Sequence, residues 1–570
     1  MDRNTLLFIV LSLVVLLTWN LVLGTRPQAP VASGSEAHVV DANSAAPTGG
    51  PLGGTAVSRA TPDAAPTPPV PATPPVPATP AVPAWTHTFE NALYRAELTN
   101  VGAGLTSWKL VEPRYVERTE DGTRPIDLIT ARPADGVVLG TPLEALGLGN
   151  LRDQPYRVES VTSDSAVLVL EVGGVTIRKS FVFDAENYLM RLSIEIDNQS
   201  GRVLNPRFET EWPTHVEKRT DFTEQSLVAF HDGGVEREAV AGVGVPGFFS
   251  DLFSSADPDG VVRMRGGIEW AGSDTTYFVG ALLPDRATSA NARFQAIQPG
   301  MAAMAVVGFE AMPLPDGQRV QNDFRVYIGP KEPLRLAAVG AQLGQAIDLG
   351  YGWIAPLTEF FSWLLHAIYT LVHNYGVAIV LLTILVRVAM LPIVTRQMKS
   401  MERMRDLQPQ IKELQEKHKD DRQKQSEAMM KLYKESGVNP LGGCFPMLLQ
   451  FPVFIGLFFA LRSSIDLRHA PFFGYIDDLS TPATLFTIPE IDLPIRLLPI
   501  LMGLSMIVQQ RMTPMTMDPA QARMMMTVMP VMMTVLFYQF PSGLVLYWMV
   551  SNVLGIAHQS YVGHKLRAAA

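Results

Sequence analysis

The sequence predicts a polytopic α-helical membrane protein that also carries a large antiparallel β-sandwich domain. Three observations lead to this fold class. Several apolar stretches approach the length of about 20 residues that a helix needs to cross a bilayer. A long region of short alternating segments lies between the first of these stretches and the others. A Pro-rich segment connects the two kinds of region.

Composition narrows the functional classes. The chain has 570 residues, of which 47% are hydrophobic, so two or three domains are expected and at least one lies in membrane. The net charge of −9 does not favour direct recognition of nucleic acid. The single cysteine, Cys444, excludes an intrachain disulfide and a cysteine metal cluster. We expect neither a metal nor another cofactor.

The N-terminal part is predicted to be an anchor followed by a spacer. Thr5 to Gly24 is almost entirely apolar and no A-x-A cleavage site follows it, so residues 1–24 are predicted to be an uncleaved transmembrane anchor. Residues 25–84 are rich in Pro and Ala and are predicted to be an extended periplasmic linker. A ligand for an SH3-type domain is the alternative interpretation of the Pro-rich repeat.

Residues 85–350 are predicted to form a periplasmic β-sandwich with a trailing helix from Leu334 to Leu349. Two strand-like runs, Ala166–Val172 and Val175–Phe183, flank Gly173-Gly174, which is typical of a tight hairpin. Leu192, Ile194 and Ile196 alternate with polar residues, as in a half-buried strand. Four polar residues suggest a sugar-enzyme site as an alternative, although their spacing is not diagnostic: Glu209, Glu211, His215 and His231.

The remaining chain is predicted to hold an interfacial amphipathic helix, residues 351–374, and a helical core, residues 375–570. Residues 396–438 carry many Lys and Arg together with Asp and Glu, and are predicted to form a cytoplasmic helical hairpin. The positive-inside rule then places residues 25–350 in the periplasm and both termini in the cytoplasm. The core spans are predicted at about 377–395, 441–461, 495–511, 524–539 and 542–560.

The most informative residue is Arg387, which lies inside the apolar run from Val377 to Val394. It lies about 15 Å along the helix from Val377, near mid-depth in a bilayer. A guanidinium there is unfavourable by at least about 2.5 kcal/mol, so it should face other helices or water, together with Thr383 one turn away. One interpretation is a structural arginine paired with a carboxylate. However, the later apolar segments contain no Asp or Glu, so an unpaired cation in a ligand site is expected.

Four motifs resemble the YidC family of bacterial membrane protein insertases: LVRVAMLPI around Arg387, MERMRDLQPQIKELQEKH in the hairpin, NPLGGCFPMLLQFPVFIGLF and FPSGLVLYWMVSN. The resemblance implies five core helices around a hydrophilic groove that is open to the cytosol and to lipid. It also implies that Arg387 is the arginine of this groove and that Thr383 is a groove residue on the same helix. Further polar groove contacts are expected from Gln450, Tyr547, Ser551 and Asn552, although polar side chains of this kind also join membrane helices to one another.

The function that the resemblance implies is insertion and folding of nascent inner-membrane proteins, either alone or beside the Sec translocon. The hairpin, with Met401 and Met429 on its apolar stripe, is expected to receive substrate from ribosome–nascent chain complexes. No nucleotide-binding loop is present in the sequence, so no enzymatic reaction is expected. A solute transporter or channel and a membrane-anchored sugar enzyme are the alternatives, and the sequence shows no inverted repeat typical of many transporters.

Overall fold

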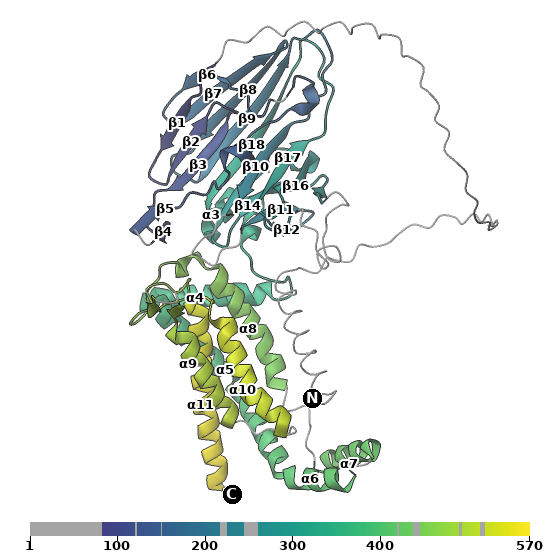
Figure 1. Ribbon diagram of the computed structural model, residues 1–570, viewed down its shortest axis with the longest axis vertical. Coiled ribbons are helices and arrows are strands. Elements are labelled where there is room, and N and C mark those ends of the chain that lie inside the picture. Colours follow the sequence, from purple (N-terminus) through teal and green to yellow (C-terminus); the bar gives the residue numbers. More distant parts are fainter. Residues whose placement is uncertain are drawn as a thin grey trace, which may run out of the picture. The chain divides into compact units, whose positions relative to one another are not determined.

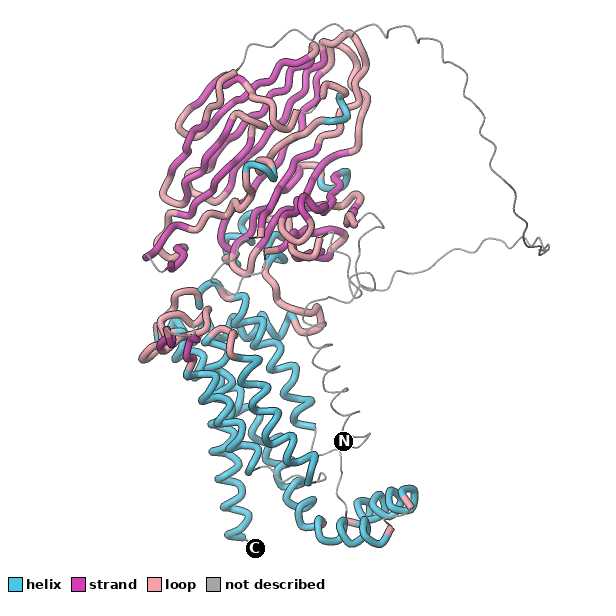
Figure 2. Tube along the Cα trace, in the orientation of Figure 1, coloured by secondary structure: helices cyan, strands magenta, loops and turns pink. Residues whose placement is uncertain are grey.

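The computed structural model describes residues 82–119, 122–149, 151–216, 225–243, 260–418, 421–436, 445–489, 493–512 and 519–569. The predicted anchor and residues 25–81 of the predicted linker lie outside these ranges. Residues 86–330 are mainly strands and residues 355–569 are mainly helices (Figures 1 and 2). Each of the two parts has its own cluster of buried hydrophobic residues.

The β domain is built from antiparallel pairs. Its strands are β1 (Thr86–Glu90), β2 (Tyr94–Thr99), β3 (Gly104–Leu110), β4 (Val116–Thr119), β5 (Gly122–Pro125), β6 (Arg157–Val161), β7 (Ser165–Val172), β8 (Val175–Phe183), β9 (Leu189–Asn198), β10 (Glu209–His215), β11 (Ser226–His231), β12 (Gly234–Ala239), β13 (Val262–Met264), β14 (Ile268–Asp274), β15 (Phe278–Pro284), β16 (Ala290–Gln298), β17 (Ala302–Phe309) and β18 (Arg319–Pro330).

Two layers of sheet confirm the predicted sandwich. A nine-stranded sheet has the order β12-β11-β14-β15-β18-β9-β8-β7-β6, and smaller sheets have the orders β10-β17-β16-β13 and β1-β2-β3. Trp212 of β10 packs directly over Gly280 of β15, where any side chain on the glycine would overlap the indole ring. Phe89 of β1 stacks on Phe183 of β8, with their ring centroids 4.1 Å apart. Both smaller sheets therefore cover the same large sheet.

Local sequence signals in this domain are confirmed where they rest on turn chemistry and alternation. Gly173 and Gly174 join β7 to β8 with positive φ angles of 58° and 77°, as a two-residue hairpin requires. Leu192, Ile194 and Ile196 are fully buried in β9.

The prediction of one trailing helix from Leu334 to Leu349 is wrong. A short helix α3 (Pro333–Val339) ends at Gly340, and a 3-10 turn (Leu343–Ala346) follows. Gly340, Ala341 and Gln342 all have positive φ, which a continuous right-handed helix excludes.

The helical part contains eight helices within the described ranges: α4 (Ala355–Val372), α5 (Tyr375–Asp406), α6 (Gln408–Lys417), α7 (Arg422–Glu435), α8 (Phe445–Ser463), α9 (Leu497–Met512), α10 (Pro519–Phe537) and α11 (Ser542–Ala569). A small hairpin of β19 (Phe486–Ile488) and β20 (Leu493–Ile495) precedes α9. Helix α11 packs most extensively against α9 and α5. It therefore joins α9 to α5 within the bundle.

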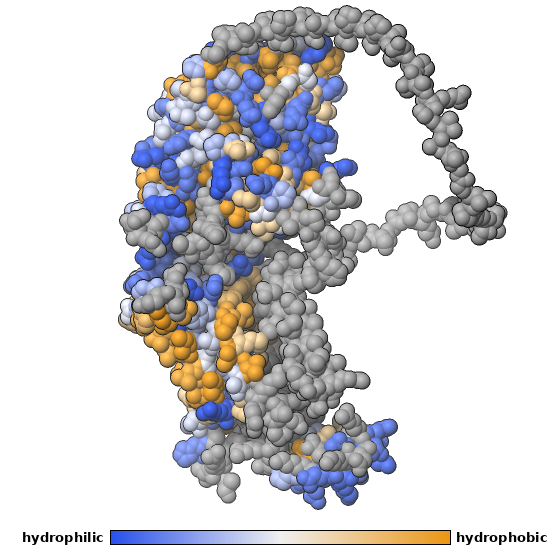
Figure 3. Space-filling model, viewed as in Figure 1, coloured by the Kyte–Doolittle hydropathy of each residue, from blue (hydrophilic) through white to orange (hydrophobic). Residues whose placement is uncertain are grey.

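The surface of the helical part is apolar over long stretches (Figure 3). Large hydrophobic side chains are exposed on α5, α9 and α10, among them Leu385, Leu504 and Val535. Among the described residues, one helical segment, Tyr375–Thr395, is long and apolar enough to cross a membrane by length and composition; α9 and parts of α8 and α10 are shorter apolar helices. Exposed apolar faces of this extent indicate contact with lipid.

The predicted hairpin is present, and it continues directly from the Arg387 helix. Helix α5 runs without a break through Pro392 to Asp406, and α6 and α7 then pack around Ile411. Asp421 caps α7 by accepting hydrogen bonds from the backbone N–H groups of Gln423 and Lys424, close to the predicted turn. The predicted boundary at residue 396 therefore falls inside one helix.

Candidate substrate site in the helical core

A line of polar side chains follows one face of α11, inside an otherwise apolar bundle. Tyr547, Ser551 and Gly555 are spaced by four residues, which places them above one another on a helix. Tyr547 and Ser551 are buried, as is Asn552 beside them. The hydroxyl and amide groups of this face are therefore directed at neighbouring helices, where each finds a partner.

Arg387 of α5 meets this face at Ser551. Its Nε and Nη2 donate hydrogen bonds to the Ser551 Oγ, at 3.0 and 2.6 Å. Within the described part of the chain, no carboxylate forms an ion pair with Arg387, and its Nη1 makes no hydrogen bond. Among the described residues, the hydrogen-bond partner of the guanidinium is therefore one neutral hydroxyl group.

Other predicted site residues extend the same line. The Gln450 Nε2 of α8 donates a hydrogen bond to the Tyr547 hydroxyl at 3.3 Å. The Asn552 Nδ2 donates one to the Ser505 Oγ of α9 at 3.0 Å. We call the set formed by Arg387, Gln450, Ser505, Tyr547, Ser551 and Asn552 the polar track. It connects α5, α8, α9 and α11 through hydrogen bonds.

Thr383 does not join the polar track through a hydrogen bond. Its side chain is buried, and its Oγ1 donates to the Ile379 carbonyl of its own helix at 2.6 Å. This is the usual local bond of a threonine within a helix. Its place on the Arg387 helix agrees with the prediction, but its hydroxyl is already paired.

The sequence analysis missed Ser505, Gln509 and Gly555. A Cβ atom on Gly555 would lie 2.7 Å from the Gln509 Nε2 and 3.8 Å from the Arg387 Nη2, so the glycine leaves room for both side chains beside α11. Ser505 and Gln509 are four residues apart in an apolar helix. That spacing is the signal that would have placed both of them on one polar face.

The hairpin methionines have different surroundings. Met429 is partly buried and packs against Ile411 within the hairpin, whereas its neighbour Met430 is 64% exposed. Met401 lies in the last part of α5, and its side chain is outside the described residues. The exposed apolar side chain on this part of the hairpin is therefore Met430 rather than Met429.

The candidate sugar site in the β domain is not assembled. Glu209, Glu211 and His215 lie on β10 and His231 ends β11, in a different sheet. Each of the three on β10 is paired: Glu209 with Arg293, Glu211 with Arg152, and the His215 Nδ1 with the Asp135 Oδ2 at 3.1 Å. Glu211 and His215 are almost completely buried. These pairs stabilise the inside of the sandwich.

Comparisons with known proteins match the β domain and the helical core separately. The family model of the 60Kd inner membrane protein matches residues 367–569, and that of the YidC periplasmic domain matches residues 86–364. A membrane protein insertase YidC from Syntrophus aciditrophicus is 32% identical over 582 residues, which cover 99% of both chains. A second, from Oleidesulfovibrio alaskensis, is 32% identical over 573 residues with the same coverage.

Among solved structures, an active YidC insertase with its first transmembrane domain resolved is 18% identical, and the match covers 83% of this chain and 91% of that one. Its TM-score is 0.35, a value too low to establish a shared arrangement of the whole chain. The full-length sequence relatives are sufficient by themselves. This chain belongs to the YidC family of membrane protein insertases.

Proposed function

We propose that this chain inserts nascent proteins into the bacterial inner membrane, and that the polar track receives the polar flank of the inserting segment. One observation supports this assignment above all others. Arg387 is an intramembrane cation whose described partner is the neutral Ser551, so its charge remains available to a substrate.

The driving force for such a step needs no nucleotide. Burying an apolar segment in lipid is favourable by about 0.8 kcal/mol per CH₂ group. The barrier is the polar flank that must cross the hydrocarbon region. A water-accessible polar track, ending near mid-depth at Arg387, shortens this crossing and offers a positive charge to acidic or polar residues of the flank. Solvation alone then lowers the barrier to insertion, and no chemical reaction is needed.

Arg387 acts in this scheme as a mobile point charge. Its two bonds to one hydroxyl group do not fix the guanidinium as a bidentate carboxylate partner would. A substrate carboxylate can therefore replace Ser551 without breaking a salt bridge of the protein. The free Nη1 offers a first contact.

Reconstitution in lipid vesicles tests this proposal. Two single-span substrates that differ only in acidic residues of the translocated tail are inserted by the wild type, Arg387→Lys and Arg387→Ala, and scored by protease protection. Arg387→Lys should retain most activity because it keeps the charge. Arg387→Ala should reduce insertion of the acidic-tailed substrate about tenfold or more, the effect of losing a charge-assisted contact of about 1.5–3 kcal/mol, and that of the uncharged one less.

The matched control is Leu385→Ala on the exposed side of the same helix, which should insert both substrates normally. Equal losses for the two substrates, or a loss with Lys as complete as with Ala, would exclude charge attraction and make Arg387 a structural residue.

The hairpin is proposed to contact substrate before Arg387 does. Its predicted contact residues are Met401 and Met429, and the exposed neighbour Met430 offers the better test. A photo-crosslinker at position 430 should capture ribosome-bound nascent chains at shorter chain lengths than one at Thr383. The matched control at position 429, which packs against Ile411, should capture less. Capture at Thr383 first would show that the hairpin only connects two helices.

The proposed setting is the inner membrane, with both termini in the cytoplasm and residues 25–350 in the periplasm. The proposed partners are ribosome–nascent chain complexes, the Sec translocon and the lipid bilayer.

A further inference from the structure

The polar face of α11 continues beyond Arg387 toward the hairpin end of α5. His558 follows Gly555 by three residues and Ser551 by seven, spacings that place all three on one face of a helix. The His558 Nε2 lies 3.1 Å from the Thr395 Oγ1 of α5. Thr395 follows Arg387 by eight residues, about 12 Å along the same helix. Along α5, this histidine contact therefore lies between Arg387 and the hairpin.

A second hydrogen bond fixes the direction of the contact between His558 and Thr395. The Thr395 Oγ1 donates its only hydrogen to the Leu391 carbonyl at 2.7 Å. It therefore accepts from His558, whose Nε2 carries the hydrogen. In a neutral imidazole of this tautomer, the Nδ1 is an acceptor. Within the described ranges, no group donates to this nitrogen, and the side chain is only half-buried.

His558 and Arg387 thus offer opposite hydrogen-bonding chemistry, because a guanidinium only donates. Gly555, one turn before His558, lies against the Arg387 Nη2, which would be 3.8 Å from a Cβ atom on the glycine. A cation so close disfavours a second positive charge, so a neutral donor suits the His558 Nδ1 better than an ammonium group does. Amide N–H groups are such donors, and bringing them into an apolar environment without an acceptor is unfavourable.

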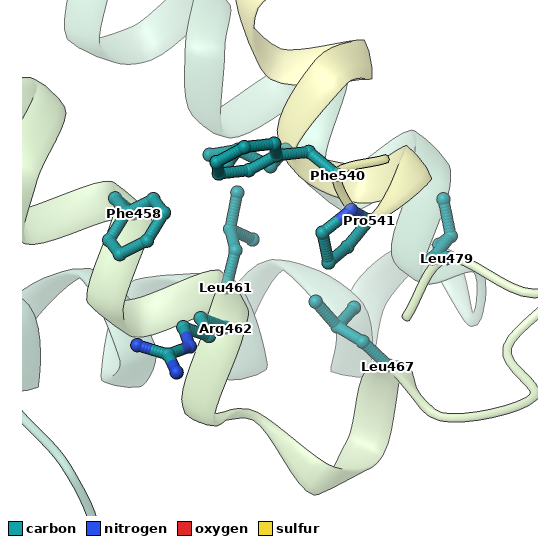
Figure 4. A pocket seen from close by; sticks show the side chains of 8 residues that line it. Phe458, Leu461, Arg462, Leu467, Leu479, Phe540 and Pro541 are labelled. Atoms are coloured by element: carbon teal, nitrogen blue, oxygen red, sulfur yellow. The ribbon is translucent and has the colours of Figure 1, made fainter. Parts of the chain in front are cut away.

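The small pocket near the C-terminal end of α8 has a different character (Figure 4). Phe458, Leu461 and Phe540 are among its lining residues, its surface is almost entirely apolar, and it has room for about one water molecule. A polar segment of a substrate gains no partner in such a space. The open acceptor on α11 is the better candidate for a contact with substrate.

We propose that His558 binds the inserting segment, its Nδ1 accepting a hydrogen bond from a neutral amide N–H group of the polar flank. Thr395 holds the imidazole in the tautomer that leaves this nitrogen open. This role rests on the proposed function and deepens it, since it assigns hydrogen-bond donors of the flank to His558 and acceptors to Arg387. The flank is then bound at two points of complementary chemistry.

Three single-span substrates test the proposal with the full-length protein in lipid vesicles. They differ at one position of the translocated tail, which is Gln, Glu or Met. These side chains have similar lengths and carry an amide donor, acceptors only, or no strong hydrogen-bonding group. Insertion rates are scored by protease protection and divided by the rate of the Met-tailed substrate. His558→Gln should lower the Gln-to-Met ratio about fivefold, the effect of one neutral hydrogen bond, and leave the Glu-to-Met ratio unchanged.

A second variant separates contact with substrate from helix packing. In His558→Gln, the new amide nitrogen reaches the place of the Nε2 and keeps the bond to Thr395, but nothing replaces the Nδ1. In His558→Asn, the new amide oxygen takes the place of the Nδ1, but the bond to Thr395 is lost. The Asn variant should therefore keep more of the Gln-to-Met ratio than the Gln variant does. His564→Gln, which changes an exposed histidine of the same helix, is the matched control and should alter neither ratio.

An unchanged Gln-to-Met ratio in His558→Gln, or an equal loss for all three substrates, would overturn the proposal and make His558 a packing residue. A ratio that His558→Gln keeps and His558→Asn loses would have the same meaning. Failure of the wild type to insert any of the three substrates would reject the proposed function together with this inference. Normal insertion of the Met-tailed substrate, with an unchanged ratio in His558→Gln, would reject only the role of His558.

Discussion

A buried ion pair of the β domain and the buried Arg387 of the helical core differ in the partners of their charges. In the β domain, Asp274 accepts from the Lys331 Nζ at 2.6 Å and from the Arg237 Nη2 at 2.9 Å, and the side chains of Asp274 and Lys331 are at most 3% exposed. In the core, Arg387 donates its side-chain hydrogen bonds to a single hydroxyl group among the described residues. The buried carboxylate of Asp274 is thus paired with two cations, whereas the charge proposed to serve substrate has no counter-ion among the described residues.

The difference predicts which substitutions damage the fold. Removing one member of a buried ion pair leaves the other charge uncompensated, which destabilises strongly. Removing an unpaired buried cation leaves nothing uncompensated. Loss of Asp274 should therefore lower the free energy of unfolding far more than loss of Arg387.

The largest effect is expected at Asp274. Asp274→Ala removes the carboxylate that pairs with both Lys331 and Arg237, and should lower the free energy of unfolding of the β domain by about 3–5 kcal/mol. Urea titration of the full-length protein, followed by tryptophan fluorescence, measures this change. Glu90→Gln, which breaks the exposed pair with Arg95, is the control and should have no measurable effect. A similar unfolding midpoint for Asp274→Ala and wild type would contradict the comparison.

A second effect should appear as a dependence on pH. Lys179 is fully buried, its Nζ donates to the Leu139 carbonyl at 2.6 Å, and burial lowers its pKa from 10.5 to about 7. Between these two values the unfolded state binds more protons than the folded state, so stability should rise with pH from about 7 to 10.5. The slope can reach about 1.4 kcal/mol per pH unit.

Lys179→Met should flatten this rise, as measured by urea unfolding at several pH values. Burial raises the pKa of Glu211 in the same region, so its contribution is present below pH 4.5 and is lost as the pH rises through its folded value. In Lys179→Met, the free energy of unfolding should still fall as the pH rises through the folded-state pKa of Glu211. A rise between pH 7 and 10.5 that is unchanged in Lys179→Met would show that another group causes it.

The smallest effect on stability is expected in the core. Arg387→Met should change the unfolding free energy by less than about 1 kcal/mol, because no counter-ion is stranded. Ser551→Ala should also have a small effect if water reaches Arg387, since water replaces the lost acceptor. In a dry site, loss of a hydrogen bond to a charged group would be unfavourable by about 1.5–3 kcal/mol. Thermal unfolding in detergent, compared between the two variants, therefore reports whether the polar track is wet.

Much of the β domain follows from local sequence rules. The Gly173-Gly174 hairpin and the alternation in β9 could be predicted because turn chemistry and a period of two act over a few residues. The pairing of β9 with β18 could not, since more than 120 residues separate partners such as Asp197 and Arg319 and no local signal specifies that register. The prediction of the trailing helix was wrong because composition alone does not reveal the positive φ angles at Ala341 and Gln342.

The part of the site that could be predicted from the sequence is the part that contains an unusual charge. Arg387 stands out in an apolar run, and the resemblance pointed to Ser551, which the structure places in contact with it. Ser505 and Gly555 were missed because small residues in apolar helices have many roles. Only the packing of α9 against α11 distinguishes these two from ordinary helix contacts.

The continuity of α5 has a mechanical consequence. This helix is 32 residues long, about 48 Å, and it joins the neighbourhood of Arg387 to the hairpin as a single rod. Pro392 weakens this rod locally: it has no N–H to donate to the Val388 carbonyl, and its ring crowds the preceding turn. The one missing backbone hydrogen bond lies between Arg387 and the hairpin. Any bend that the rod makes should therefore be concentrated there, and not at the turn that carries the guanidinium.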